Sequence, residues 1–129
     1  MKYIRKQSIK IKKIAYIINH VDFFDSHISP IAVKAKKKFK VKLFCGKSAS
    51  LVMKKYSLKS LKKKKISFVQ KNFSSSNINV IKEFFNLISL IYSVKKYDPD
   101  IIHCATPKGI LLGGLVSFFL KTKSLIIFN

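Results

Sequence analysis

Residues Tyr97–Gly114, with the sequence YDPDIIHCATPKGILLGG, decide the fold of this chain. Pro99 ends any preceding helix, because proline lacks an N–H and its ring clashes with the turn before it, and it pushes Asp98 toward an extended conformation. Ile101 and Ile102 begin a short β-branched run that is typical of a strand buried on both faces. A turn and an apolar helix follow. The stretch therefore predicts part of a parallel sheet, in which ligands bind at the carboxyl ends of the strands.

Strands and helices are predicted to alternate along the rest of the chain, after a basic lead-in at residues 1–12. The predicted strands are Ile14–Asn19, Val41–Cys45, Ile66–Gln70, Ile101–Cys104 and Ser124–Asn129. The predicted helices are Ser29–Lys38, Ser48–Tyr56, Asn79–Lys96 and Pro107–Leu120, with connectors at His20–Pro30 and Leu58–Lys65. This order predicts one α/β domain over residues 13–129: a Rossmann-like open parallel sheet of about five strands, in the order 3-2-1-4-5, with helices on both faces.

The clearest helical pattern lies in Asn79–Lys96. Its apolar residues recur at the i, i+3, i+4, i+7 spacing of one helix face, so we expect them to face the core: Ile81, Phe84, Phe85, Ile88 and Ile91. Asn77 or Asn79 can cap the first turn of this helix, and a serine can cap the helix predicted over Ser48–Tyr56.

The charge of the chain is its most unusual bulk property. Among 129 residues, 27 Lys and Arg face 5 Asp and Glu, a formal net charge of +22. This excess indicates an anionic partner such as nucleic acid or an anionic membrane. However, Arg5 is the only arginine, and arginine is the residue favoured for bidentate contacts to bases and phosphates. We therefore expect no dedicated reader of nucleic acid, and a biased coding composition is the simpler explanation of the lysines.

Other features of the composition bear on compartment. Cys45 and Cys104 end apolar runs and have no metal or disulfide spacing, so both are expected to be buried thiols, and no metal is expected. Met1–Lys13 is basic, but the apolar run Ile14–Ile18 is too short for a signal peptide. The longest uncharged apolar stretch, Gly109–Leu120, falls short of the roughly 20 residues that span a bilayer. We expect a cytoplasmic protein, peripheral at most to a membrane.

A site is predicted between the loops that follow the first and fourth strands, because a crevice opens there in a sheet of this order. These loops are His20–Pro30 and Ala105–Gly109. They hold or adjoin all three histidines and two of the five carboxylates: His20, His27, His103, Asp22 and Asp25. The backbone N–H groups around Lys108 and Gly109 start a helix and can hold a phosphate, although no glycine-rich phosphate motif is present.

A structural interpretation of the same residues is also possible. His103, in a buried strand, is more often a hydrogen-bonded structural histidine than a base. Asp98 and Asp100 fit turn and strand-entry positions, and Glu83 fits a solvated charge in a first helical turn. The spacing of the histidines does not match a metal site. Three glycines are expected to let the last helix pack closely on the sheet: Gly109, Gly113 and Gly114.

Two phrases, KIAYIINHVDFFDSHISPIA from Lys13 and KKYDPDIIHCATPKGILLGGL from Lys95, carry a resemblance. The residues that carry it are Phe23, Phe24, Ser26, His27, Pro30, Pro99, Asp100, Ile101, His103, Thr106, Pro107, Lys108, Gly113 and Gly114. From Lys13 to Asn129 the chain resembles the N-terminal domain of two-domain (GT-B fold) bacterial glycosyltransferases of the family-4 type, which build lipopolysaccharide, O-antigen and capsule sugars. Many members carry a glycine-rich loop after the first strand, near the donor diphosphate, and this chain has no glycine there.

The resemblance implies the acceptor-side domain of a sugar-nucleotide-dependent glycosyltransferase, either truncated or half of a split enzyme, and inactive alone. The expected partners are a missing C-terminal donor domain, which would bind most of the nucleotide sugar, and a sugar or lipid-linked sugar acceptor at the membrane. No further cofactor is expected. His27 and Asp22 are the implied catalytic candidates. The implied acceptor contacts are Asn19, His20, Phe23, Phe24, His27, His103, Thr106, Lys108 and Gly109.

An alternative from another class is a non-enzymatic basic α/β module that binds nucleic acid or anionic membrane through charge alone. The two alternatives differ in where the binding residues lie. The glycosyltransferase domain uses a crevice between loops, whereas the charge-driven module uses a diffuse lysine surface.

Overall fold

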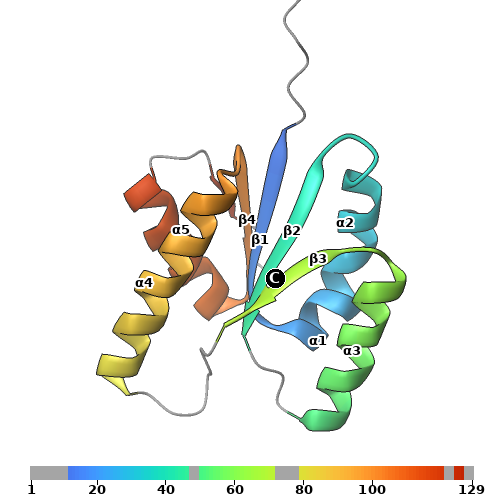
Figure 1. Ribbon diagram of the computed structural model, residues 1–129, viewed down its shortest axis with the longest axis horizontal. Coiled ribbons are helices and arrows are strands. Elements are labelled where there is room, and N and C mark those ends of the chain that lie inside the picture. Colours follow the sequence, from blue (N-terminus) through green and yellow to red (C-terminus); the bar gives the residue numbers. More distant parts are fainter. Residues whose placement is uncertain (1–11, 47–49, 72–78, 121–123, 127–129) are drawn as a thin grey trace, which may run out of the picture.

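The computed structural model describes residues 12–46, 50–71, 79–120 and 124–126, and strands and helices alternate along it (Figure 1). The strands are β1 (Lys13–His20), β2 (Lys40–Gly46), β3 (Ser67–Gln70), β4 (Ile101–Ala105) and β5 (Ser124–Ile126). The helical segments are α1 (Val21–Phe23), η1 (Phe24–Ile28, a π-helical turn), α2 (Ser29–Ala35), α3 (Leu51–Lys63), α4 (Val80–Tyr97) and α5 (Pro107–Leu120). Nearly all of the predicted basic lead-in lies outside the described residues.

The strands form one parallel sheet in the order β3-β2-β1-β4-β5, which confirms the predicted fold class and strand order. Four strands, β3-β2-β1-β4, make up its body. The fifth, β5, is three residues long and pairs with the outer side of β4. Strand β1 lies at the centre, and six consecutive residues, 14–19, are buried in it. This continuous burial is expected of a parallel strand covered on both faces.

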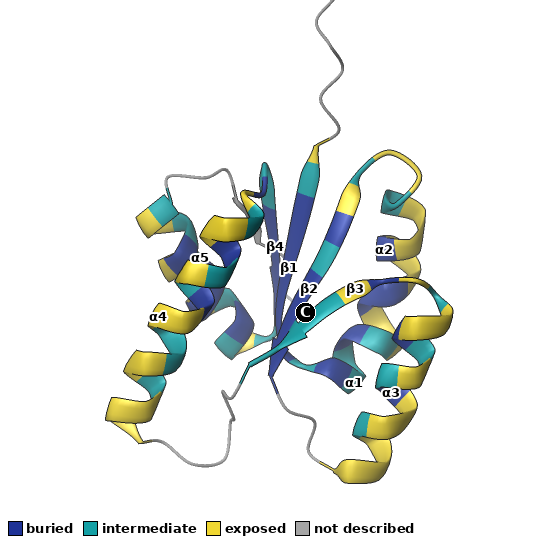
Figure 2. Ribbon diagram, viewed as in Figure 1, coloured by how far each residue is buried: buried dark blue, intermediate teal, exposed yellow. Residues whose placement is uncertain are grey.

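Helices cover the two faces of the sheet in separate layers (Figure 1). The segments α1, η1, α2 and α3 lie on one face, and α4 and α5 on the other. Alternate side chains of β1 pack against the two helix layers, because successive side chains of a strand point to opposite faces of the sheet. Tyr16 and Ile18 join the core beneath the first layer, whereas Ala15 and Ile17 join the core beneath α4 and α5. Figure 2 shows β1 coloured as buried along most of its length.

Both predicted types of helix cap are present. The Ser50 side chain accepts from the Met53 N–H at the start of α3, and Asn79 accepts at the start of α4, whereas Asn77 lies outside the described residues. At the other end of α4, Asp98 was expected to be extended but has φ 56° and ψ 61°. This left-handed cap lets its N–H donate to the Val94 and Lys95 carbonyls, and aspartate tolerates it better than most residues.

Two predicted connectors are helical instead. The segment His20–Pro30 contains α1, η1 and the start of α2, because Val21, Phe24 and Ile28 recur at helical spacing and are all buried. The lysine-rich connector Leu58–Lys65 mostly continues α3, which reaches Lys63 because Leu61 anchors its last turn in the core.

The predicted core face of α4 is largely wrong. Ile81, Phe84 and Phe85 are 69%, 60% and 64% exposed, and Ile88 is exposed as well. The fully buried residues are Leu90 and Val94, with Ile91 partly buried beside them. These lie in the second half of the helix, so only that half packs deeply, and the first half carries an apolar surface.

Close packing of α5 depends on two of the three predicted glycines. A Cβ on Gly113 would overlap the Cys104 sulfur, and a Cβ on Gly109 would stand 2.9 Å from the Ile17 carbonyl oxygen. Gly114 has nothing within 4 Å of such a Cβ, so the prediction is wrong for it. Cys45 and Cys104 are free, buried thiols, as predicted, and burial raises their pKa to about 12 and about 11.

Candidate functional site

The carboxyl ends of β1 and β4 lie side by side in the middle of the sheet. Ile18 of β1 pairs with Ala105 of β4. β1 then passes directly into α1, and β4 passes through Thr106 into α5. Because α5 starts at this edge, its first turn packs against β1: the Cβ position of Gly109 is 2.9 Å from the Ile17 oxygen and 3.3 Å from the Ile18 Cα.

Thr106 holds the turn between β4 and α5 in a strained conformation. Its φ is +70°, which is a clear outlier for a β-branched residue. The strain is held in place by the helix that it caps: Thr106 Oγ1 accepts from the Gly109 N–H at 3.2 Å, and the Ile110 N–H donates to the Thr106 carbonyl at 2.8 Å. Backbone strain of this kind costs about 1–3 kcal/mol and concentrates at functional sites.

Asn19 offers an unpartnered oxygen at this edge. It is 5% exposed and lies near the end of β1, where the register with β2 shifts between Ile18 and His20. Its Nδ2 lies 3.3 Å from His20 Nε2, so the amide nitrogen and the ring are paired. Its Oδ1 is buried and has no hydrogen-bond partner among the described residues. A buried acceptor in this state costs about 1–3 kcal/mol, which a hydroxyl donor from a ligand would recover.

Asp22, in the first turn after β1, has a second such oxygen. Its Oδ1 is buried without a partner in the described part of the chain, and the residue as a whole is half-buried. Its backbone carbonyl accepts from Ser26 Oγ at 2.8 Å, which holds the turn. Asn19 and Asp22 therefore bring two unpartnered oxygens to the carboxyl end of the central strand.

His27 is exposed on the surface of η1. Its ring stacks on Phe23, with centroids 4.5 Å apart and planes 13° apart, and its Nδ1 lies 2.9 Å from Ser26 Oγ. Phe23, which follows Asp22 in the sequence, is only half-buried, so the stacked pair presents an aromatic surface. Asp25, by contrast, is structural: it accepts from Ser60 at 2.8 Å and Lys64 at 2.9 Å, and so ties η1 to α3.

The structure does not support the predicted contact between Phe24 and the acceptor. It is fully buried, and its ring packs edge-on against Tyr16 at 5.5 Å, so it belongs to the core and offers no face to a ligand.

His103 lies in the body of the sheet. It is 5% exposed, its ring is 4.7 Å from that of Tyr16, and its Nε2 has no partner among the described residues. Burial lowers its pKa below the ordinary value, which keeps the imidazole neutral at neutral pH.

Lys108 points toward the α4 layer. Its Nζ is 2.9 Å from Glu83 Oε1, an ion pair that ties α5 to α4. His27 lies in the opposite layer, on η1.

At the carboxyl edge of the sheet the structure brings together Asn19, His20, Thr106 and Gly109. In the described part of the chain, no three His, Cys, Asp or Glu side chains come together to hold a metal ion.

The family model described as glycosyl transferase 4-like matches residues 13–128 of the chain. No curated protein sequence matches it. Among solved structures, a glycosyltransferase from Rickettsia africae ESF-5 has a TM-score of 0.65 and 16% identity, over 91% of this chain and 29% of that one. MurG from Acinetobacter baumannii gives 0.65 and 16%, over 91% and 34%. The UDP-GlcNAc 2-epimerase from Neisseria meningitidis, bound to UDP-GlcNAc, gives 0.58 and 17%, over 89% and 32%.

The chain spans about a third of the length of these structures. At such low identities the likeness establishes the fold. An epimerase shares that fold with the glycosyltransferases, and a fold alone does not specify a reaction.

Proposed function

The chain belongs to the glycosyl transferase 4-like family, and from this we propose that it is the acceptor-side domain of a sugar-nucleotide-dependent glycosyltransferase. We propose further that the enzyme acts in the synthesis of cell-surface polysaccharide or lipopolysaccharide, at the cytoplasmic face of the membrane. The observation that carries the assignment of the site is the pair of buried, unpartnered oxygens on Asn19 and Asp22.

Each residue of the proposed site has a chemical role. Asn19 Oδ1 accepts a hydrogen bond from an acceptor hydroxyl, and the Phe23–His27 stack provides an apolar face for a sugar ring. Asp22 or His27 takes the proton from the attacking hydroxyl, because a carboxylate or imidazole within hydrogen-bond reach can act as a general base. The N-terminal end of α5, where the helix dipole is positive, favours a phosphate of the substrate.

The nucleotide-sugar donor is proposed to bind mainly outside this chain, on a C-terminal domain or a split-enzyme partner. A donor must be held against the acceptor for transfer, so the isolated chain is expected to bind acceptor sugars without turnover. This separates acceptor binding, which the chain can be tested for directly, from catalysis.

Acceptor binding is tested by titrating the full chain with mono- and disaccharides and following sugar signals by saturation-transfer NMR. Asn19→Leu should lower the affinity by about tenfold, which corresponds to about 1.4 kcal/mol, through loss of one buried hydrogen bond. Gln70→Leu is the matched control, because Gln70 also has a buried, unpartnered amide atom but lies at the end of β3. Equal loss in both variants, or no sugar binding by the parent chain, would refute the site.

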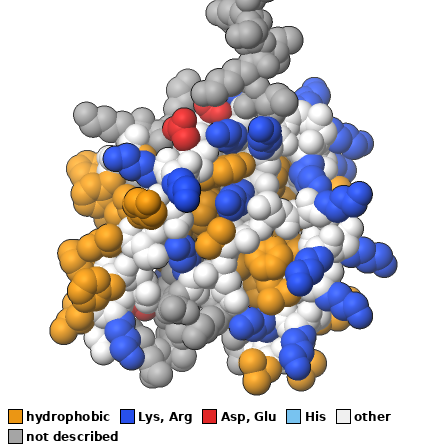
Figure 3. All heavy atoms as spheres, viewed as in Figure 1, with side chains coloured by type: hydrophobic (Ala, Val, Ile, Leu, Met, Phe, Trp, Pro, Cys, Tyr) orange, Lys and Arg blue, Asp and Glu red, His pale blue; other side chains and the backbone are white. Residues whose placement is uncertain are grey.

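The apolar surface of α4 and α5 supports a peripheral position at a membrane. Large apolar side chains are exposed along both helices, and Figure 3 shows hydrophobic groups along the left edge of the molecule, over these helices. They are Val80, Ile81, Phe84, Phe85, Ile88, Tyr92, Leu111, Leu115, Phe118 and Phe119. A groove lies between the two helices and is lined by Ile91, Lys95, Asp98, Pro99, Phe119 and Leu120. Lysines beside an apolar surface suit an anionic bilayer, each adding about 1 kcal/mol.

Membrane binding is tested by co-sedimentation with phosphatidylcholine vesicles, with and without phosphatidylglycerol. We expect binding to the anionic vesicles that is partly retained at high salt, because burial of apolar groups is not screened. Phe84→Ser/Phe85→Ser should abolish the retained part. Tyr56→Ser, which removes a comparably exposed aromatic ring from α3, should not. Equal effects of the two changes would contradict the proposal.

A further inference from the structure

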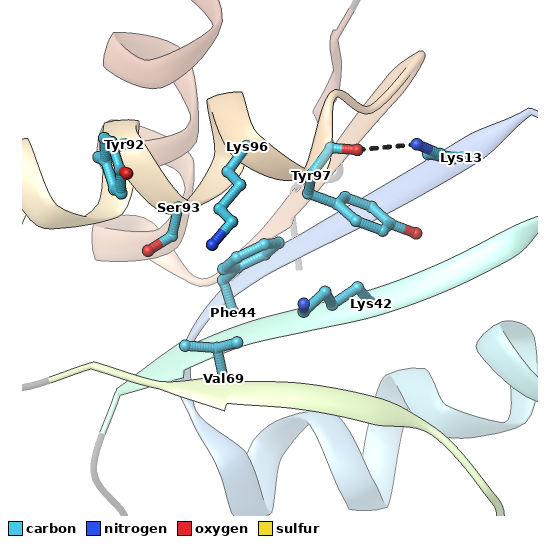
Figure 4. A pocket seen from close by; sticks show the side chains of 8 residues that line it. All are labelled: Lys13, Lys42, Phe44, Val69, Tyr92, Ser93, Lys96 and Tyr97. Carbon is cyan, nitrogen blue, oxygen red and sulfur yellow. Dashed lines mark hydrogen bonds between the residues drawn. The ribbon is translucent and has the colours of Figure 1, made fainter.

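A polar cavity lies beside α4, away from the edge that carries the candidate site (Figure 4). It has a volume of about 460 Å³ and opens between α4 and the face of β1, β2 and β3. Lys13, at the first residue of β1, is one of its walls, whereas the candidate site begins at Asn19, near the last residue of the same strand. The two sites are therefore separated along the sheet.

Three lysines from three elements line this cavity: Lys13 of β1, Lys42 of β2 and Lys96 of α4. No Asp or Glu lines it. In the part of the chain that the structure describes, neither Lys42 nor Lys96 forms an ion pair. Three positive charges that line one cavity repel one another, and an anion bound in the cavity would reduce that repulsion.

Two of these cations lie against the ring of Tyr97. Lys13 Nζ lies 5.6 Å and Lys42 Nζ 5.5 Å from the centre of its ring, and Lys13 Nζ also donates to the Tyr97 carbonyl at 3.2 Å. Lys42 is further held 5.9 Å from the ring of Phe44. In the view of Figure 4 the two ammonium groups lie on opposite sides of the Tyr97 ring, that of Lys13 at the Tyr97 carbonyl and that of Lys42 toward Phe44.

Tyr97 also supplies a hydroxyl without a partner. Its oxygen is buried and makes no hydrogen bond among the described residues. Burial, and next to it the charge of Asp100, raise the pKa of Tyr97 to about 12, so the hydroxyl keeps its proton and can donate at neutral pH. Asp100 is the nearby acid, and its carboxylate accepts from the Lys13 backbone N–H at 2.9 Å.

We propose that the cavity formed by Lys13, Lys42, Lys96 and Tyr97 binds a phosphate group. Lysine ammonium groups and a phenol hydroxyl are donors, and a phosphate presents several charged acceptor oxygens, so it can accept from more than one of them. A carboxylate, with two oxygens and one charge, would satisfy fewer. The proposal does not depend on glycosyl transfer, and it can fail while the acceptor site stands.

The test measures the affinity of the full chain for pyrophosphate by calorimetry, at constant ionic strength in chloride. Lys42→Gln/Lys96→Gln should weaken binding by about tenfold or more, because charge-assisted hydrogen bonds are lost. The control is Lys37→Gln/Lys38→Gln, which removes the same charge from exposed lysines after α2. It should change binding by less than about twofold, since screened distant charges contribute little. Tyr97→Phe should also weaken binding without lowering the melting temperature of the free protein.

Equal weakening in the two double variants would overturn the proposal, because binding would then follow net charge. So would the absence of any pyrophosphate binding. Soluble glycerol 3-phosphate and vesicles containing phosphatidic acid present the same phosphate monoester in two forms. If Lys42→Gln weakens binding to the soluble form, the cavity takes a free ligand. If it weakens binding to the vesicles alone, the phosphate belongs to a lipid headgroup. An effect on neither form would refute the site.

Discussion

Gly113 of α5 lies so close to Cys104 of β4 that a methyl group on it would overlap the sulfur and stand 3.1 Å from the cysteine Cβ. Gly114, the next residue, faces open space. The two neighbouring glycines of one helix therefore have different physical roles. Gly113 sets the distance between α5 and the sheet, and Gly114 leaves the helix without a side chain where one would fit.

This contrast gives a prediction about stability. Gly113→Ala should destabilise the protein by about 1–3 kcal/mol, because overpacking forces the helix away from β4. Gly114→Ala should stabilise it by up to about 1 kcal/mol, the difference between alanine and glycine inside a helix. Urea denaturation of both variants measures the change. Destabilisation of similar size in both would mean that α5 does not pack on the sheet at Gly113.

The core of the sheet should respond to a cavity at Ile102. This residue is fully buried in the cluster beneath α4 and α5, so Ile102→Ala should lower the free energy of unfolding by about 2–5 kcal/mol. Ile88→Ala removes the same atoms from an exposed position on α4 and should change stability by less than about 0.5 kcal/mol. Thermal melts compare the two variants. If Ile88→Ala lowers stability as much as Ile102→Ala does, the exposed face of α4 is covered in solution.

His103 should make stability depend on pH. Burial lowers its pKa below the ordinary value of 6.5, so the unfolded chain binds a proton at a pH where the folded chain does not. This contribution to stability is fully present above the unfolded pKa and is lost as pH falls from there toward the folded pKa. His103→Leu should therefore show a flatter fall of the urea midpoint below pH 6.5 than the parent. If the urea midpoint of His103→Leu falls with pH as steeply as that of the parent, a group other than His103 causes the fall.

The proposed catalytic candidates can be tested in an enzyme reconstituted from this chain and the proposed donor domain. Asp22→Ala and His27→Ala should lower the transfer rate without lowering the melting temperature, because neither side chain is part of the buried core. The expected loss is about 10²–10⁴-fold for the residue that acts as general base. If both variants lose activity only in proportion to the folded protein that remains, the two residues are structural.

The sequence was enough to predict the layers and the strand order, because buried parallel strands are apolar throughout and crossovers have one hand. It was not enough for His20–Pro30. The polar residues and Pro30 there indicated a loop, although Val21, Phe24 and Ile28 already had helical spacing. Propensity and pattern disagreed in this segment, and burial against β1 decided the outcome.

The meeting of the two segments was predictable, whereas a site between them stays a prediction. The ends of neighbouring central strands meet at one edge in any sheet of this order, and the pairing of Ile18 with Ala105 brings Asn19 and Thr106 to that edge. Lys108 and His27, by contrast, lie in opposite layers. The strained φ of Thr106 and the unpartnered oxygen of Asn19 depend on neighbours from distant segments. The lysine cavity was missed for the same reason, and its one signal was Lys42, a charge inside the otherwise apolar run Val41–Cys45 of β2.

The central position of β1 has a consequence for how the protein folds while it is being synthesised. The hydrogen bond from the Lys13 N–H to Asp100 joins residues 87 positions apart, so β1 has no partner on that side until β4 has been made. At roughly 5–20 residues per second, this delay is roughly 4–17 s for each nascent chain. During that time an apolar strand edge is open to other chains. We expect the yield of folded protein to depend on how well the cell shields nascent β1.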